Sequence, residues 1–232
     1  MSAIAIFVKT PGLSPVKTRL ADAIGPEWAM ELYRLCADAM LSIAKAAEIG
    51  PVYWAVAESI PAAAGHWQPR APVLHQGDGS LGERMCRVMN VLVDQHGSGI
   101  LLGADSPQFE IEPLREAANW LSSESRRSVI GPARDGGFWT FGSNHCIEEK
   151  HWTRVTYSRP DTFRQFEHSM KNEADWLELP RLTDLDTVTD LGVLHSELKC
   201  LDHPLPAQSR LIRALSAMQS TNLNPRNKTS HA

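Results

Sequence analysis

The chain has 232 residues, and its hydrophobic content of 43% and charged content of 22% are ordinary for a globular protein with a substantial core. Its formal net charge of -4 at pH 7 argues against a nucleic-acid partner held by bulk electrostatic attraction. The length suits one large α/β domain or two small ones, and neither an internal repeat nor a clear linker divides it.

The cysteines and the apolar runs indicate the cellular compartment in which we expect the protein. The four cysteines contain no C-x-x-C pair, so they indicate neither a zinc site nor a redox motif. Cys36 and Cys86 fall in predicted helices, where we expect small, buried hydrophobic side chains. The apolar run at 3–8 is too short for a signal peptide or a membrane span, and no later stretch reaches spanning length. We therefore expect a cytoplasmic, reduced protein without a membrane span.

The first half of the chain alternates short apolar runs with amphipathic ones. Residues 3–8 are uninterrupted and apolar, which is typical of a strand buried on both faces of a parallel sheet. A helix is predicted from Pro26, which suits a first helical turn, to near Gly50, a natural stop. Further strands are predicted at 52–57, 72–75 and 99–105, and a second helix at 79–97.

The second half continues this alternation. It predicts a helix at 112–122, a strand at 128–133, an aromatic strand after Gly137 and a last helix at about 206–219. We expect residues 1–204 to form a single domain, and residues 205–232 to supply the C-terminal helix and a disordered polar tail.

The alternation of strands and helices predicts the fold class. It favours a three-layer α/β/α, Rossmann-like protein with a mostly parallel, doubly wound sheet. In such a sheet the carboxyl ends of the strands share one edge with their loops. We expect Lys9, Asp105 and the segment 131–139 to gather there.

Residues 10–19, TPGLSPVKTR, are similar to a phosphate-binding loop that lacks one glycine. A P-loop has its second glycine directly before the lysine, but Val16 holds that place, and a β-branched residue does not readily adopt a positive φ. The segment still brings Lys9, Lys17 and Arg19 together after a strand, and three cations can neutralise a polyphosphate. A solvated basic loop is the alternative.

Two acidic segments could hold a divalent cation. Asp105 follows a predicted buried strand, and Mg²⁺ is often held by one or two carboxylates plus substrate phosphates. Residues 182–191 contain three aspartates before a predicted helix, and one of them could supply a second ligand opposite Asp105. The alternatives are a turn closed by Asp105 and a helix cap, which is the stronger interpretation for Asp190.

Two glycine-containing segments suit a substrate. The pair Gly136-Gly137 permits a tight turn or a close backbone approach, and Asp135 before it could bind a hydroxyl or act as a base. Residues 77–85 form a glycine-rich loop that opens a helix, which suits an anion or a substrate. Glu83 and Arg84 in this loop could instead be a surface ion pair.

Several common site patterns are absent from the sequence. The nine histidines show no H-E-x-x-H spacing, and no G-x-S-x-G elbow is present. No G-x-G-x-x-G follows the first strand, which argues against a dinucleotide-binding domain.

Six segments in order span most of the chain up to about residue 200, namely FVKTPGLSPVKTRLADAIG, GDGSLGERM, LLGADSP, IGPARDGGFWTFG, VTYSRPDTF and LPRLTDLDTVTDL. Together they resemble an uncharacterised family of nucleotide-diphosphosugar transferases with the glycosyltransferase-A fold. That family includes proteins described as arsenosugar-biosynthesis glycosyltransferases. It is similar to nucleotidyltransferases that act on phospholactate or molybdopterin.

This resemblance implies roles for particular residues. The first loop would bind nucleotide phosphates, Asp105 and Asp186 would hold Mg²⁺ or Mn²⁺, and Asp135 would position or deprotonate the acceptor. The phosphate-binding residues would be Lys9, Pro11, Gly12, Lys17 and Arg19, and the substrate-binding residues Gly82, Arg84, Gly136 and Gly137.

One departure bears on the metal. Sugar transferases of this fold carry a D-x-D motif, but Gly103 stands at its first acidic position. Metal binding would therefore depend on Asp105, Asp186 and the phosphates of the substrate.

The sequence leaves three functions open. The first is metal-assisted transfer of a glycosyl group from a nucleotide-sugar to a small-molecule acceptor. The second is a nucleotidyltransferase that joins an NTP to a phosphorylated small molecule. The third is a non-catalytic nucleotide-binding protein on the same scaffold. None of them involves nucleic acid or a membrane span, and no feature of the sequence specifies an oligomeric state.

Overall fold

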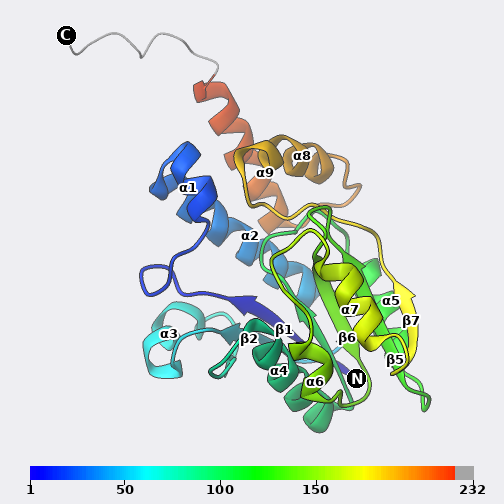
Figure 1. Ribbon diagram of the computed structural model, residues 1–232. Coiled ribbons are helices and arrows are strands. Elements are labelled where there is room, and N and C mark those ends of the chain that lie inside the picture. Colours follow the sequence, from blue (N-terminus) through cyan, green and yellow to red (C-terminus); the bar gives the residue numbers. More distant parts are fainter. Residues whose placement is uncertain (223–232) are drawn as a thin grey trace, which may run out of the picture.

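A seven-stranded sheet with helices on both faces organises the protein (Figure 1). The computed structural model describes the backbone of residues 1–222. The strands are β1 (Ser2–Val8), β2 (Val52–Val56), β3 (Val73–His75), β4 (Ser98–Leu102), β5 (Arg127–Pro132), β6 (Phe138–Ser143) and β7 (Asp175–Glu178). The helices are α1 (Thr18–Ile24), α2 (Pro26–Ala46), α3 (Ile60–Trp67), α4 (Leu81–His96), α5 (Glu112–Leu121), α6 (Glu149–Thr153), α7 (Thr162–Met170), α8 (Val188–Lys199) and α9 (Pro206–Asn222).

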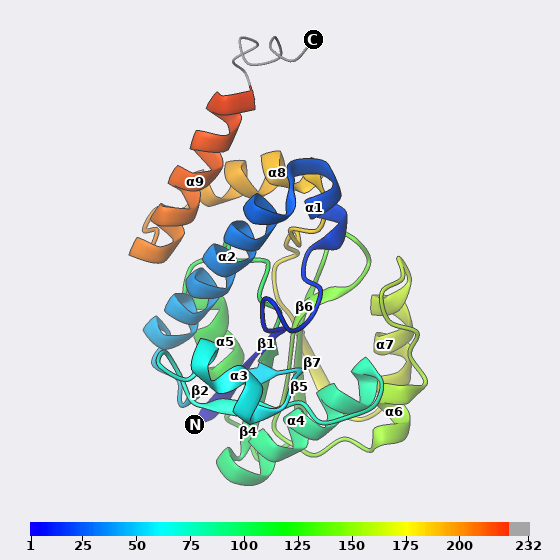
Figure 2. The same ribbon diagram turned by 90° about the vertical axis from the view of Figure 1, so that its left-hand side faces the viewer.

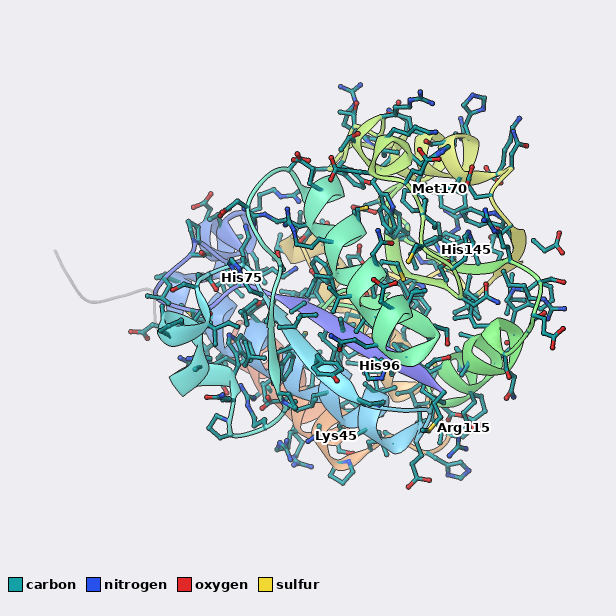
Figure 3. The ribbon with its side chains drawn as sticks, turned by 90° about the horizontal axis from the view of Figure 1, so that it is seen from below. Lys45, His75, His96, Arg115, His145 and Met170 are labelled. Carbon is teal, nitrogen blue, oxygen red and sulfur yellow. The ribbon has the colours of Figure 1, made fainter. Side chains whose placement is uncertain are left out.

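The sheet order is β3-β2-β1-β4-β6-β5-β7, and β6 runs antiparallel to both of its neighbours. All other pairings are parallel, so the predicted α/β class with a mostly parallel sheet is confirmed. In Figure 3, His75 at the end of β3 and His96 just before β4 mark opposite ends of the strands. The carboxyl end of β4 lies beside the start of β6, because Leu102 pairs with Thr140.

Hydrophobic clusters fill the space on each face of the sheet. Ile4 and Ile6 of β1 face a cluster shared with α2, α3 and α5, while Ala3 and Ala5 face one shared with α4, α6 and α7. This alternation explains why 3–8 reads as an unbroken apolar run. Cys36 in α2 and Cys86 in α4 are buried, as predicted.

A third cluster joins the C-terminal helices to the amino-terminal ones. Leu20 of α1 and Leu32 of α2 pack with Leu194 of α8 and Leu211 of α9, and these helices lie together at one end of the molecule (Figure 2). We therefore propose that the single domain predicted for 1–204 extends through α9. The predicted disordered tail falls largely on residues 223–232, outside the described part of the chain.

The structure also contains elements that the sequence patterns did not predict. These are α1, α3, α6, α7 and the short edge strand β7. The strand predicted at 99–105 ends at Leu102, which leaves Asp105 in the following loop. No helix within residues 1–222 is long and apolar enough to cross a membrane.

The turn at 133–137 is fastened to the segment before α7. Gly136 has φ of +91°, and a Cβ added there would lie 1.9 Å from the carbonyl oxygen of Pro160. The Gly136 carbonyl accepts a hydrogen bond from the backbone N–H of Phe163. Only glycine satisfies both the positive φ and this close approach.

A Gly136→Ala substitution should lower the free energy of unfolding by about 2–4 kcal/mol, because it adds a left-handed backbone strain and a steric overlap. Gly192→Ala is the matched control, since Gly192 lies in α8 with open space around its Cα. The control should stabilise the protein by up to about 1 kcal/mol through helix propensity. Urea denaturation of both variants tests this, and equal effects would contradict the account of the turn.

Candidate functional site

Two adjoining cavities open at the carboxyl edge of the strands. The basic cavity has a volume of about 500 Å³, and its lining includes Lys9, Lys17, Arg84, Asp105 and Asp186. The aromatic cavity has a volume of about 310 Å³, and its lining includes Asp105, Asp135, Phe138, Tyr157 and Asp184. Four residues belong to both linings: Phe7, Leu81, Gly103 and Asp105.

A buried ammonium group connects two carboxylates where the cavities meet. Lys17 Nζ donates to Asp105 Oδ2 at 2.5 Å and to Asp186 Oδ1 at 2.9 Å. The other oxygen of Asp186 accepts from Arg19 at 2.6 Å. The side chain of Lys17 is only 6% exposed, whereas that of Arg19 is 70% exposed. The structure thus brings together four of the residues singled out in the sequence.

The charges of this cluster change the acidity of its members. Burial alone would lower the pKa of Lys17, but Asp105 and Asp186 more than offset it, so the pKa is raised and the side chain stays charged. Burial alone would raise the pKa of Asp186, but Lys17 and Arg19 hold that pKa below its usual range. At neutral pH the Asp186 carboxylate therefore stays ionised beside the charged ammonium group of Lys17.

Side chains from α2, from α3 and from the loop between β2 and α3 fix the backbone at the start of the first loop. The Glu58 carboxylate accepts hydrogen bonds from the backbone N–H and the hydroxyl of Thr10, and that hydroxyl also accepts from Trp67 Nε1. The Tyr33 hydroxyl accepts from the Lys9 N–H and donates to the Lys9 carbonyl. Lys17 takes a left-handed φ of 47° directly before α1. The Glu58 and Tyr33 contacts fix Lys9 and Thr10 at the start of the loop, and the sequence patterns gave no sign of them.

The cations around the basic cavity differ in whether they are already paired. Lys9 is exposed and, within the described residues, forms no salt bridge. Arg84 donates through Nε to the Gly79 carbonyl and likewise meets no carboxylate within 1–222. These two cations remain able to meet an incoming anion, while Lys17 and Arg19 are held by aspartates.

Not every residue assigned to the first loop faces the basic cavity. From this loop, Lys9, Pro15, Val16 and Lys17 line the cavity. Pro11, Gly12 and Arg19 do not. Pro11 forms a local bridge with Ser14, and Gly12 is an exposed turn residue. Their phosphate-binding role stays a prediction.

Of the two glycine-containing segments, the one at 135–137 contributes to the lining of the aromatic cavity, whereas Gly82 packs against a helix. Asp135 and Gly137 line the aromatic cavity, where Asp135 Oδ1 accepts the Gly137 N–H at 2.8 Å. Gly82 is buried, and a Cβ there would lie 2.7 Å from the Trp152 carbonyl oxygen, so its Cα packs against α6. Its substrate-binding role stays a prediction.

Helices α4 and α8 each begin with a capping box. Glu83 forms a capping box with Ser80 at the start of α4 and is not the surface partner of Arg84. Asp190 forms a capping box with Thr187 at the start of α8, so the cap interpretation of Asp190 is confirmed.

Asp184 is a site residue to which the sequence patterns gave no role of its own. Its side chain lines the aromatic cavity and accepts a hydrogen bond from Ser106 Oγ. Burial, and next the nearby charge of Asp105, raise the pKa of Asp184 well above its usual range. The sequence shows that Asp184 and Asp186 are two residues apart, but it does not show that Asp184 lies beside Ser106 and Asp186 beside Lys17.

The carboxylates at the junction fit a divalent cation. Asp105 and Asp186 hold one ammonium between them, so their oxygens already converge on the position of a positive charge. Carboxylate oxygens are the ligands that Mg²⁺ and Mn²⁺ prefer. No group of three or more His, Cys, Asp or Glu side chains suited to a metal occurs within 1–222. Further ligands would thus come from substrate phosphates or water.

Comparison with solved structures defines the class of protein. A protein from Desulfovibrio desulfuricans G20, provisionally assigned as a nucleotide-diphospho-sugar transferase, matches with a TM-score of 0.80 and 27% identity over 95% of this chain and 97% of that one. A cytidylyltransferase from Leptospira borgpetersenii serovar Hardjo-bovis matches over all of both chains, with a TM-score of 0.58 and 14% identity. A manganese complex from Mycobacterium tuberculosis H37Rv matches 84% of this chain and 98% of that one, with a TM-score of 0.50 and 15% identity. The chain has the fold of nucleotide-utilising transferases.

Residues 40–159 match the family described as "uncharacterized protein conserved in bacteria" (DUF2064), and the chain belongs to that family. The matched segment includes Asp105 and Asp135, while Lys17 and Asp186 lie on either side of it. The resemblance to nucleotide-diphosphosugar transferases seen in the sequence is confirmed at the level of family and fold. No curated protein matches the sequence.

Replacing Lys17 tests the electrostatic account of the junction. A Lys17→Met variant should lose about 2–4 kcal/mol of unfolding free energy without divalent cations, because two partly buried carboxylates lose their counter-ion. Added Mg²⁺ should restore more stability to this variant than it adds to the wild type.

The matched control is Arg19→Met, which removes an exposed cation and should cost under about 1 kcal/mol. Chemical denaturation with and without Mg²⁺ measures all three proteins. Equal responses to Mg²⁺ in the wild type and in Lys17→Met would contradict a cation site between Asp105 and Asp186.

Proposed function

We propose that this protein is a divalent-metal-assisted glycosyltransferase that moves a sugar from a nucleotide-sugar to a small-molecule acceptor. The observation that carries the proposal is the position of the Lys17 cluster between the basic cavity and the aromatic cavity. A diphosphate bound on one side would have its leaving group next to an acceptor bound on the other side.

In this proposal the basic cavity binds the diphosphate of the donor. Lys9 and Arg84 contact the phosphates first, because neither is engaged by a carboxylate among the described residues. Lys17 adds a positive charge close to the bond that breaks. Cations placed where negative charge develops lower the barrier of such a transfer.

A divalent cation would be held by Asp105 and Asp186 and would neutralise the charge that builds up on the diphosphate. The manganese complex of the protein from Mycobacterium tuberculosis supports this choice of ion. Asp105 Oδ2 and Asp186 Oδ1 converge on the Lys17 ammonium, so a divalent cation bound by these two oxygens would take the place of that contact.

On the other side of the junction, Asp135 positions the acceptor hydroxyl and takes its proton. One oxygen of Asp135 accepts the Gly137 N–H, which fixes the carboxylate and leaves the other oxygen for the acceptor. A bond forms between the acceptor oxygen and the anomeric carbon. The bond from that carbon to the donor phosphate breaks, and its electron pair leaves with the nucleoside diphosphate.

A nucleotidyltransferase that uses a free NTP is the second candidate, favoured by the fold shared with the cytidylyltransferase. The nucleotide-sugar reaction ranks first because the Desulfovibrio protein, which is provisionally assigned to it, shares more of its sequence with this chain. Thermal-shift measurements with UDP-, GDP- and CMP-sugars against free NTPs separate the two. Stabilisation by NTPs alone would favour the second candidate, and no Mg²⁺-dependent stabilisation at all would favour a non-catalytic protein.

An Asp105→Asn substitution should weaken Mn²⁺-dependent binding of the donor selected in that screen by about 10- to 100-fold, since it removes a metal ligand. Isothermal titration calorimetry with and without Mn²⁺ measures the effect. The control Thr18→Ala should change the affinity little, because Thr18 is the first residue of α1 and not a P-loop threonine. Unchanged affinity in Asp105→Asn would exclude the metal role, and an equal loss in Thr18→Ala would reopen the P-loop interpretation.

A further inference from the structure

The aromatic cavity has a composition that limits what it can bind. Its deep walls are apolar and come from β4, β6 and α4, and they include Leu101, Phe141 and Met85. Phe138 and Tyr157 stand closer to the opening and are only partly buried. Such walls bind an apolar surface or the face of a ring.

The charged or acidic groups of this cavity are three carboxyl groups and one guanidinium, beside the hydroxyls of Thr140, Tyr157, Ser158 and Thr162. Asp105, Asp135 and Asp184 all face it, from three different loops at the edge of the sheet. Among the described residues that line it, Arg159 is the one cationic side chain. Its Nε already donates to Asp161, and its side chain is 60% exposed. The basic cavity, by contrast, has Lys9, Lys17 and Arg84 in its lining.

This distribution of charge divides the site by ligand chemistry. Anionic phosphates suit the basic cavity, but in the aromatic cavity they would lie against the acidic side chains of Asp105 and Asp135, with one engaged arginine to balance them. Hydroxyl groups suit the aromatic cavity, because the Asp135 oxygen that the Gly137 N–H does not occupy can accept a hydrogen bond from a hydroxyl. A volume of about 310 Å³ corresponds to about ten water molecules, which suits one small molecule.

We propose that the aromatic cavity is the acceptor site and that its ligand is an uncharged, hydroxyl-bearing molecule with one apolar face, such as a ring. Phosphorylated and carboxylated acceptors are rejected. The identification of this ligand as the acceptor rests on the proposed function, whereas the ligand preference of the cavity can be measured without it. The apolar face lies on Phe138 and Tyr157, and a hydroxyl donates to Asp135.

Phenyl β-D-glucopyranoside and its 6-phosphate are a matched pair of probes, since they differ by one phosphate. Calorimetry with the full chain and no nucleotide should give at least tenfold tighter binding of the neutral probe. Asp135→Arg should abolish or reverse this preference. Asp135→Asn, which can keep the hydrogen bond from the Gly137 N–H, should reduce it. The control Glu124→Arg makes the same change of charge on an exposed loop between α5 and β5 and should keep the preference.

Each outcome decides the inference. Equal or tighter binding of the phosphorylated probe, failure of both probes to bind, or an equal effect of Glu124→Arg overturns it. Separate titrations with UDP, GDP and CDP in the presence of Mn²⁺ test the proposed function. Loss of nucleotide binding with retained preference for the neutral probe would overturn the transferase proposal and leave the ligand preference standing.

Discussion

The site depends on one buried ammonium group shared by two carboxylates. Lys17 belongs to the loop after β1, Asp105 to the loop after β4, and Asp186 to the loop before α8. These loops come from distant parts of the chain, and the salt bridges hold them together at the same edge of the sheet. Taking the Lys17 side chain out of water is costly, so its burial requires both partners to be in place.

Both cavities reach this contact through Asp105, and they differ in character. Because Lys17 and Arg19 are occupied by aspartates, the basic cavity presents Lys9 and Arg84 as its available cations. On the other side, Asp135 and Asp184 face an aromatic wall. Asp105 belongs to both linings, so it lies where a donor and an acceptor would meet.

Much of the framework could be predicted from sequence because it follows from local patterns. The buried strand at 3–8, the helix that begins at Pro26 and the cap at Asp190 each depend on a few neighbouring residues. The gathering of Lys9, Asp105 and Asp135 at one edge follows from the parallel sheet itself. The edge strand β7 was not predicted, because its four residues, DWLE, contain no apolar run of strand length.

The rest of the site depends on contacts across the chain that no local pattern records. Sequence showed cations in the first loop, but not that Lys17 would be buried against acids 88 and 169 residues away. The sequence showed Asp184 and Asp186 close together in the chain. Only the structure shows that Asp186 contacts Lys17, whereas Asp184 contacts Ser106. The packing of Gly82 against α6 and the anchoring of the loop by Glu58 are likewise tertiary effects.

The most direct test of the central claim is anomalous diffraction from crystals soaked with Mn²⁺ and a nucleoside diphosphate. The account predicts one manganese peak between the carboxylates of Asp105 and Asp186, with the diphosphate in the basic cavity beside Lys9 and Arg84. A manganese peak elsewhere, or a diphosphate bound while Lys17 still joins both aspartates with no metal between them, would contradict it.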